Sequence, residues 1–385
     1  DGYVTGQYAS AAVLQGRAVV SFTDMTFDLD SREYVFVSST GTISCVACTV
    51  ENDKLFSDAS STALAYFFGC TMPTDARYDV TASSQVMRND NEVAIEEITE
   101  YHTYRTELPG PNSKKIVSIT KYGAKGDGKT DDGPAIGRAV VAAMEQQATL
   151  RFESGKTYYI GSTDRSAGPF SSPFAMNGAD GVTVDGGGSV FRFAPGINYF
   201  ALTSNKDIRF CNMKLDLSVS PYLVGTVKAV NGANVTYTTD IEPHQTYVDS
   251  RNSVNFSIKY NEGTQQRPHQ FINTVQKTAS KEVKVEYQTE NHGYSVGDKV
   301  FLPNPGVGNA LSEIMYISAN TGCMVFENIE VWAAPSFIAN VRENDAEIYF
   351  ENVDYVPGAE NDREIKMVSW RDGYHVKDNR RPIHW

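Results

Sequence analysis

A phrase of eight residues that recurs along the chain limits its fold more than any other feature. Four clear copies begin at Val20, Ile208, Met324 and Ile348 and read VSFTDMTF, IRFCNMKL, MVFENIEV and IYFENVDY. Each copy has an apolar residue first, Phe third, Asp or Asn fifth, an apolar residue sixth, and an apolar or aromatic residue last. Two weaker copies follow the first, at Ile43 and Ala65. The first three copies along the chain, at Val20, Ile43 and Ala65, are spaced by 23 and 22 residues, and the last two, at Met324 and Ile348, by 24.

A fixed period in this range is typical of stacked architectures, in which each repeat packs on the next. The apolar positions would face inward and stack. The fifth position would lie at a bend, because Asp and Asn tolerate left-handed backbone. These fifth residues are Asp24, Asn212, Asn328 and Asn352. The pattern predicts an all-β fold, a right-handed parallel β-helix with coils about 4.8 Å apart. A flat β-sandwich is the alternative, but it does not explain the matching intervals.

Composition narrows the class of protein further. The chain has 385 residues, of which 41% are hydrophobic and 21% charged, which excludes collagen-like, coiled-coil and mainly disordered chains. No apolar run approaches the ~18 residues that span a bilayer. The charge sum, 34 − 47 = −13, disfavours nucleic acid and anionic membranes as partners. No secretory signal opens the chain, although a processed secreted protein would look the same.

The remaining segments predict the order of the domains along the chain. One helix is predicted over Asp132–Gln147, with Asp131 or Asp132 as N-cap and Pro134 in the first turn. It is placed to cover the open end of the coils. We expect coils over 1–72, a connecting segment over 73–113, the entrance, cap helix and first coils over 114–215, an all-β insertion over 216–310, and further coils over 311–385.

Cysteine and histidine suggest no metal site, and no cofactor is predicted. The five Cys are an odd number in a long chain, so they do not indicate a disulfide framework of the small secreted kind. Cys45 and Cys48 form a C-x-x-C, but residues three apart in a strand point to opposite faces, and no second ligand pair follows. The sequence has no Gly-x-Ser-x-Gly elbow, so it gives no support for serine catalysis.

The segment from Val117 to Asp132, VSITKYGAKGDGKTDD, resembles the entrance motif of pectin-lyase-like parallel β-helix proteins. In it, Gly123, Gly126 and Gly128 would allow a tight turn and the Asp side chains would bond turn amides. Gly123 to Thr130 also matches the phosphate-loop spacing Gly-x-x-x-x-Gly-Lys-Thr. Two features argue against a nucleotide site. Asp127, Asp131 and Asp132 would repel phosphates, and Pro134 places the start of the helix after Lys129 and Thr130 rather than at them.

The order of the later segments resembles that of β-helical α-1,3-galactosidases. The resemblance covers about residues 114–385, and VSWRDGYHVKDNRRPI from Val368 is similar to the segment in which that branch carries an active-site Asp ahead of a His. It implies Asp372 and His375 as catalytic residues. That branch has a paired Asp-Asp on the following coil, which does not follow here before Trp385. We expect either a fragment that joins two modules, or a permuted domain whose coils 1–72 stack beyond the last.

Hydrolysis of a glycosidic bond takes two carboxyl groups. Asp372 is the candidate for one of them, and neighbouring side chains would contact sugar or steady charge: Trp370, Arg371, Tyr374 and Lys377. The alternative is a simple polar turn between coils. Nearby acidic residues are assigned to a solvated face: Glu343, Asp345, Glu360, Asp362 and Glu364.

The resulting expectation is a secreted enzyme that hydrolyses glycosidic bonds in a polysaccharide or glycan, outside the cytoplasm, at the cell surface or in the periplasm. A polysaccharide lyase is the weaker choice of enzyme. The non-enzymatic alternatives are a β-helical structural or adhesive protein of a virion or cell surface, and a glycan-binding module. Association of copies through the helix ends is a further expectation.

Overall fold

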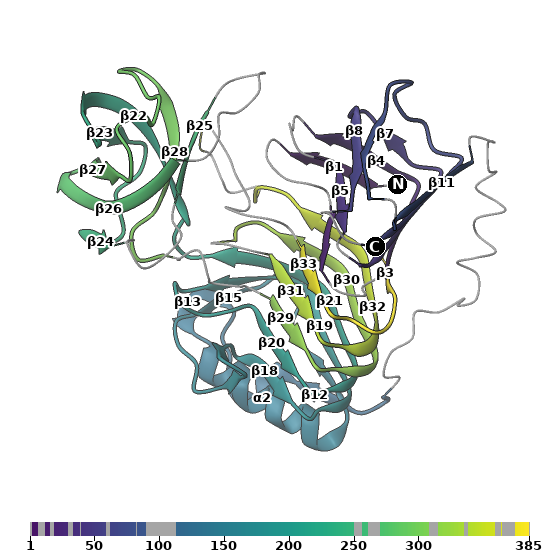
Figure 1. Ribbon diagram of the computed structural model, residues 1–385. Helices are drawn as coiled ribbons and strands as arrows, with labels where there is room; N and C mark the ends of the chain where they lie inside the picture. The colour runs from purple at the N-terminus through teal and green to yellow at the C-terminus, as the bar shows by residue number, and fades with distance from the viewer. Residues whose placement is uncertain are drawn as a thin grey trace.

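The computed structural model describes residues 2–6, 12–15, 19–29, 34–38, 40–58, 62–81, 83–89, 113–249, 256–260, 270–307, 315–334, 338–358, 363 and 374–384. Most of their strands are stacked in parallel, an arrangement compatible with a parallel β-helix (Figure 1). No helix among the described residues is long and apolar enough to cross a membrane.

Two large sheets run along the stack. The first has 13 strands, in the order β11 (Gln85–Asn89), β9 (Leu64–Phe68), β6 (Thr42–Val46), β3 (Val19–Thr23), β34 (Ile383–His384), β32 (Asp345–Tyr355), β30 (Thr321–Val331), β21 (Lys206–Leu217), β19 (Asp180–Phe193), β14 (Thr149–Arg151) and β12 (Ile116–Ser118), with β13 (Asp127–Asp131) and β15 (Thr157–Ile160) beside this path.

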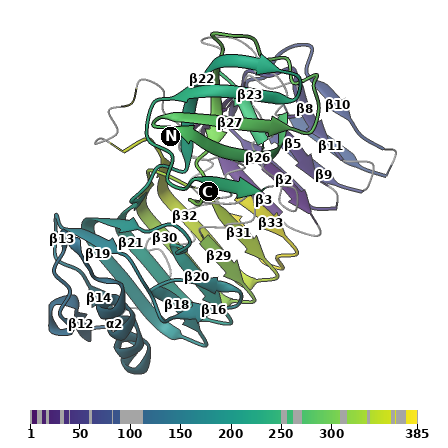
Figure 2. The same ribbon diagram turned by 90° about the vertical axis from the view of Figure 1, so that its left-hand side faces the viewer.

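The second sheet has nine strands, which Figure 2 shows side by side. Their order is β10 (Arg77–Asp79), β8 (Lys54–Ser57), β5 (Phe36–Ser38), β2 (Ala12–Gln15), β33 (Tyr374–Lys377), β31 (Ala339–Arg342), β29 (Met315–Ser318), β20 (Phe200–Thr203) and β18 (Phe174–Asn177). Three short parallel strands form a further face: β1 (Gly2–Gly6), β4 (Met25–Leu29) and β7 (Thr49–Val50). A small hairpin, β16 (Ser166–Ala167) and β17 (Phe170–Ser171), is antiparallel.

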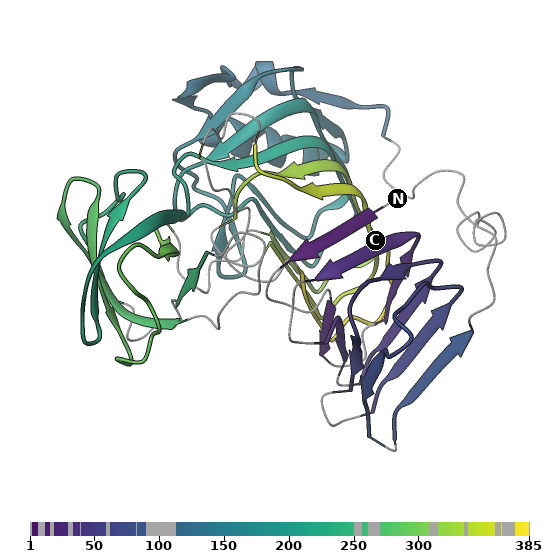
Figure 3. The same ribbon diagram turned by 90° about the horizontal axis from the view of Figure 1, so that it is seen from above.

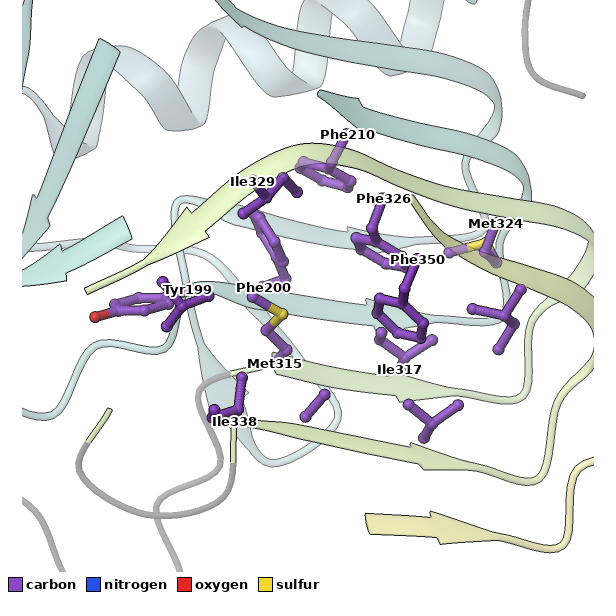
Figure 4. Close-up of a cluster of buried hydrophobic side chains, with 14 of the residues drawn as sticks. Tyr199, Phe200, Phe210, Met315, Ile317, Met324, Phe326, Ile329, Ile338 and Phe350 are labelled. Carbon is purple, nitrogen blue, oxygen red and sulfur yellow. The ribbon is translucent and has the colours of Figure 1, made fainter. Parts of the chain in front are cut away.

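The recurring phrase sets the register of the first sheet, as predicted. Phe210 pairs with Phe326, and Phe326 with Phe350, so the same phrase position repeats on adjacent coils. The rings of Phe326 and Phe350 stack with centroids 5.0 Å apart inside the coils (Figure 4). The fifth position of each phrase lies at a bend with positive φ, which confirms the expectation for Asp and Asn there. The φ values are +53° at Asp24, +57° at Asn212, +52° at Asn328 and +51° at Asn352.

One expectation about side-chain direction is wrong. Ala47, at φ +52°, occupies the bend position between Cys45 and Cys48. Because the bend interrupts the alternation of a straight strand, both thiols are buried in the core.

A second bend in four successive coils carries a ladder of buried Asn side chains, which we did not predict from the sequence. The Nδ2 atom of Asn205 donates to Asn320 Oδ1 (3.0 Å), Asn320 Nδ2 to Asn344 Oδ1 (3.0 Å), and Asn344 Nδ2 to Asn379 Oδ1 (2.7 Å). The backbone amides of the first three members donate to the same oxygens. The ladder therefore satisfies donors that the turn would otherwise leave buried and unpaired.

The predicted helix is α2 (Gly133–Gln146), which contacts β12, β14, β18 and β19 and covers one end of the stack. Asp132 stands at its N-cap position, but its side chain makes no cap hydrogen bond. Its carboxylate instead accepts the amides of Lys125 (2.7 Å) and Gly126 (2.9 Å), while Asp131 Oδ1 accepts the amide of Gly133 (3.1 Å). The carboxylate of Asp132 thus stabilises the turn before the helix, and the carboxylate of Asp131 stabilises the start of the helix.

The entrance turn does not form a phosphate cradle. Gly123, Gly126 and Gly128 have positive φ, as expected of a tight turn. The amides of Lys129 and Thr130 both donate to Asp127 Oδ1, at 2.9 and 2.7 Å. A carboxylate of the chain already occupies these donors, which argues against the nucleotide hypothesis.

The first coils of the chain stack beyond its last coil, as the permuted order predicts. β3 pairs in parallel with β34, Val20 opposite Ile383, and β2 pairs with β33. Figures 1 and 3 show these N-terminal strands beside the C-terminal ones. The stack also extends past residue 72, where we expected it to end, because β10 pairs with β8 and β11 with β9.

The segment between β21 and β29 forms a separate antiparallel barrel. Its strands are β22 (Tyr222–Asn231), β23 (Asn234–Thr239), β24 (Tyr247–Asp249), β25 (Phe256–Lys259), β26 (Gln270–Ala279), β27 (Glu282–Tyr287) and β28 (Lys299–Pro303). Pairing runs β26-β25-β28-β22-β23-β27 and returns to β26, with β24 outside on β26. The barrel has its own apolar core and lies to one side of the coils (Figure 3).

Candidate functional site

The residues nominated from the sequence fall into two groups. Trp370, Arg371 and Asp372 lie outside the described residues. Tyr374, His375 and Lys377 all belong to β33, in the middle of the nine-stranded sheet. Because successive residues of a strand point to opposite faces, this strand separates Tyr374 from His375.

Tyr374 faces the core. Its ring packs edge-on against Phe350 (centroids 4.8 Å apart) and Tyr355 (5.4 Å). Burial raises the pKa of its hydroxyl well above the ordinary value, and the negative charge of Asp354 raises it further. Both ring contacts are with side chains that pack on the core, so Tyr374 anchors the start of β33 to the core.

His375 lies on the opposite side of β33 from Tyr374. His375 pairs with Asn340 of β31, and Lys377 pairs with Arg342. The Lys377 and Arg342 side chains thus stand on neighbouring coils, and Arg342 also contacts Glu343 (3.3 Å). The structure does not bring all the nominated residues of β33 to one point.

Two carboxylates on adjacent coils lie side by side on the outside of the stack, each between two residues that pack on the core. Glu330 of β30 and Asp354 of β32 are register partners, so their backbones are about 4.8 Å apart. Glu330 is held firmly: Oε1 is 3.3 Å from Lys214 Nζ, and Oε2 accepts the indole N–H of Trp332 at 2.7 Å. The side chain of Asp354 is exposed, and its carboxylate forms no hydrogen bond or ion pair within the described part of the chain.

An aromatic and a cationic side chain adjoin this pair. Lys214 Nζ lies 5.5 Å from the ring centre of Trp332, which is mostly buried against Gly358. A carboxylate fixed by two donors next to a second, exposed carboxylate suits acid–base chemistry at an ether oxygen. We define Lys214, Glu330, Trp332 and Asp354 as the carboxylate site.

The connection between β32 and β33 is tied to the barrel through Arg363. Its Nε donates to Asp240 Oδ2 (2.7 Å), its Nη1 donates to Ser220 Oγ (2.6 Å), and its guanidinium lies 4.0 Å over the ring of Tyr222. These contacts fix one point of the connection that carries Asp372. The barrel therefore takes part in positioning that connection.

A second group of carboxylates has a simpler role. On the outer face of the 13-stranded sheet, Arg209 pairs closely with Glu327, and Arg151 lies 3.6 Å from Asp185. Likewise, Asp345 of the predicted acidic run is exposed and pairs with Arg381 (2.9 Å). Paired and partly solvated carboxylates of this kind fit a charged surface. Glu360, Asp362 and Glu364 of that run lie outside the described residues.

Sequence reasoning missed Glu330 and Asp354, although a signal for them was present. Both occupy the seventh position of the recurring phrase, as Lys214 does in the copy before them. Because the register stacks equal phrase positions, Lys214, Glu330 and Asp354 form one row across three coils. An alignment of the copies therefore groups these residues, whereas a search for adjacent motifs does not.

No family model matches the chain, and no curated protein matches it. Among the described residues, no group of three or more His, Cys, Asp or Glu side chains is arranged to hold a metal ion.

Proposed function

We propose that the protein is a carbohydrate-active hydrolase that cleaves glycosidic bonds in a polysaccharide or glycan outside the cytoplasm. The observation that carries this proposal is the carboxylate site, in which Glu330 and Asp354 are register partners on adjacent coils and Lys214 and Trp332 hold Glu330. The resemblance to pectin-lyase-like β-helical glycosidases supports the same class. A right-handed winding of the coils belongs to this proposal, since crossovers between parallel strands nearly always have that hand.

The two carboxylates would have different roles. Both oxygens of Glu330 are already engaged by Lys214 and Trp332, so this group would stabilise the positive charge that develops on the sugar ring. Asp354 is exposed and would exchange a proton with water or with the leaving oxygen. Asp372, which the resemblance implies as catalytic, would supply the other proton-transfer group from the connection that precedes Tyr374.

The test is a screen of galactosides, uronates and sulfated polysaccharides for reducing-end release. On a substrate that is cleaved, we expect Asp354→Asn to lower kcat by roughly 100-fold or more, the usual contribution of a proton-transfer group. Glu351→Gln is the matched control, because Glu351 is an exposed carboxylate on the same strand but on the other face of the bend. It should keep kcat within about twofold.

The other outcomes are also informative. Release that persists in Asp354→Asn would reject Asp354 as a proton-transfer group and leave the class of enzyme standing. Glycan binding without any release would favour the non-catalytic alternative, a binding module or a β-helical structural or adhesive protein. Thermal unfolding of each variant separates loss of chemistry from loss of fold.

A further inference from the structure

Three cysteine side chains meet inside the coils near the β10–β11 end of the stack. Cys45, Cys48 and Cys70 are buried, and all are reduced. Cys45 and Cys48 flank the bend of one coil, and Cys70 follows the same bend on the next, where Gly69 has φ +58°. The repeat therefore brings together thiols that are 22 residues apart in the sequence.

The backbone register makes Cys48 and Cys70 direct neighbours. The amide of Thr71 donates to the carbonyl of Cys48 at 2.9 Å, and Thr49 forms a parallel bridge with Thr71. Adjacent parallel strands are about 4.8 Å apart, which falls within the Cα separation of a disulfide, roughly 4.4 to 6.8 Å. The backbone would need little movement to join them.

The thiols already interact. Cys70 Sγ donates to the carbonyl of Cys45 at 3.4 Å, and Cys48 Sγ to that of Val46 at 3.4 Å. The hydrogen bond to Cys48 is the main cause of a strongly raised pKa at Cys70, and the hydrogen bond to Cys45 raises the pKa of Cys48 to about 12. Buried, protonated thiols react slowly, so a small oxidant is required.

We propose that Cys48 and Cys70 are an oxidisable pair that closes a disulfide between adjacent coils when the protein meets a peroxide. Cys70 is the more exposed of the two, at 8% against 1%. As its thiol loses its proton, the Cys70 sulfur attacks one oxygen of hydrogen peroxide and the O–O bond breaks, so that the sulfur becomes a sulfenic acid while the other oxygen takes up that proton and leaves as water. Cys48 then attacks that sulfur and expels a second water. Two thiols and one peroxide thus give one disulfide and two waters.

The experiment uses the wild-type chain and hydrogen peroxide under native conditions. Remaining thiols are then counted in denaturant, and the oxidised peptides are mapped by mass spectrometry without reduction. We expect five thiols to fall to three and the peptides of Cys48 and Cys70 to be joined. The thermal midpoint should rise by roughly 3 to 5 °C, because the bridge closes a loop in the unfolded chain.

Matched variants identify the pair. Cys70→Ser and Cys48→Ser should each abolish both the thiol loss and the rise in midpoint, whereas Cys45→Ser and Cys211→Ser should retain them. A bridge between Cys45 and Cys48, or five thiols that persist after complete exposure to peroxide, would overturn the proposal. The wild-type peptide map decides the question even if a variant fails to fold.

Discussion

Side-chain amides follow the coils in two ladders that differ in burial. The ladder at the recurring phrase is partly exposed: Asn352 Nδ2 donates to Asn328 Oδ1 (3.1 Å), and Asn328 Nδ2 to Asn212 Oδ1 (3.2 Å). Its Asn residues were predicted because they belong to a repeated pattern with a known backbone preference. The buried ladder was not predicted, because its Asn residues lie outside the phrase and no common residue precedes them: Asn320 follows Ala319, and Asn344 follows Glu343.

We expect Asn320→Ala to lower the free energy of unfolding by about 3 to 5 kcal/mol. It leaves the amide and Nδ2 of Asn205 without their acceptor and removes a donor from Leu202 O, and each buried unsatisfied group costs about 1 to 3 kcal/mol. Asn352→Gly is the control, since it keeps the left-handed bend at an exposed site and should cost less than about 1 kcal/mol. Chemical denaturation measures both, and equal losses would contradict a special role for the buried ladder.

At the scale of elements, structures set by neighbouring residues were predicted from the sequence, whereas closure of the antiparallel barrel was not. The entrance turn and α2 were predictable because their Gly, Asp and Pro residues act on neighbours within a few positions. Closure of the barrel was not, because it depends on pairings between strands that are far apart in the chain, β22 with β28 and β23 with β27, which short-range patterns do not encode. The role of Arg363 depends on such distant contacts too, since it joins the connection after β32 to Asp240 and Tyr222.

The entrance turn gives a pH prediction. Hydrogen bonds from the Thr130 amide, the Lys129 amide and the Thr130 hydroxyl lower the pKa of Asp127 from 3.8 to about 2. A carboxyl whose pKa is lower in the folded state stabilises the fold above its unfolded pKa and loses that contribution as the pH falls. The stability difference between the wild type and Asp127→Ala should therefore be present at pH 6 and shrink between about pH 4 and 2. A difference that is constant over this range, measured by denaturation at each pH, would contradict the assignment.

At the scale of the whole molecule, the repeats predicted stacked coils, and the strand register decides their order. The same register creates the carboxylate site, because it sets Lys214, Glu330 and Asp354 side by side on three successive coils. An alignment of the phrase copies groups these residues, but only the strand register shows that their coils are neighbours, since the distance between copies along the chain varies with each connection. Coil order is thus the physical basis of the proposed chemistry.

The most direct test of this order measures the distance between Glu351 on β32 and Met87 on β11. Spin labels at Glu351→Cys and Met87→Cys occupy exposed positions, while the five native cysteines are buried. Five strand spacings of about 4.8 Å separate the two strands, so pulsed electron resonance should give one narrow distance near 25 Å, unchanged when labelled protein is diluted with unlabelled protein. A broad distribution beyond about 40 Å, or a 25 Å signal that disappears on dilution, would contradict stacking of the first coils on the last coil of the same chain.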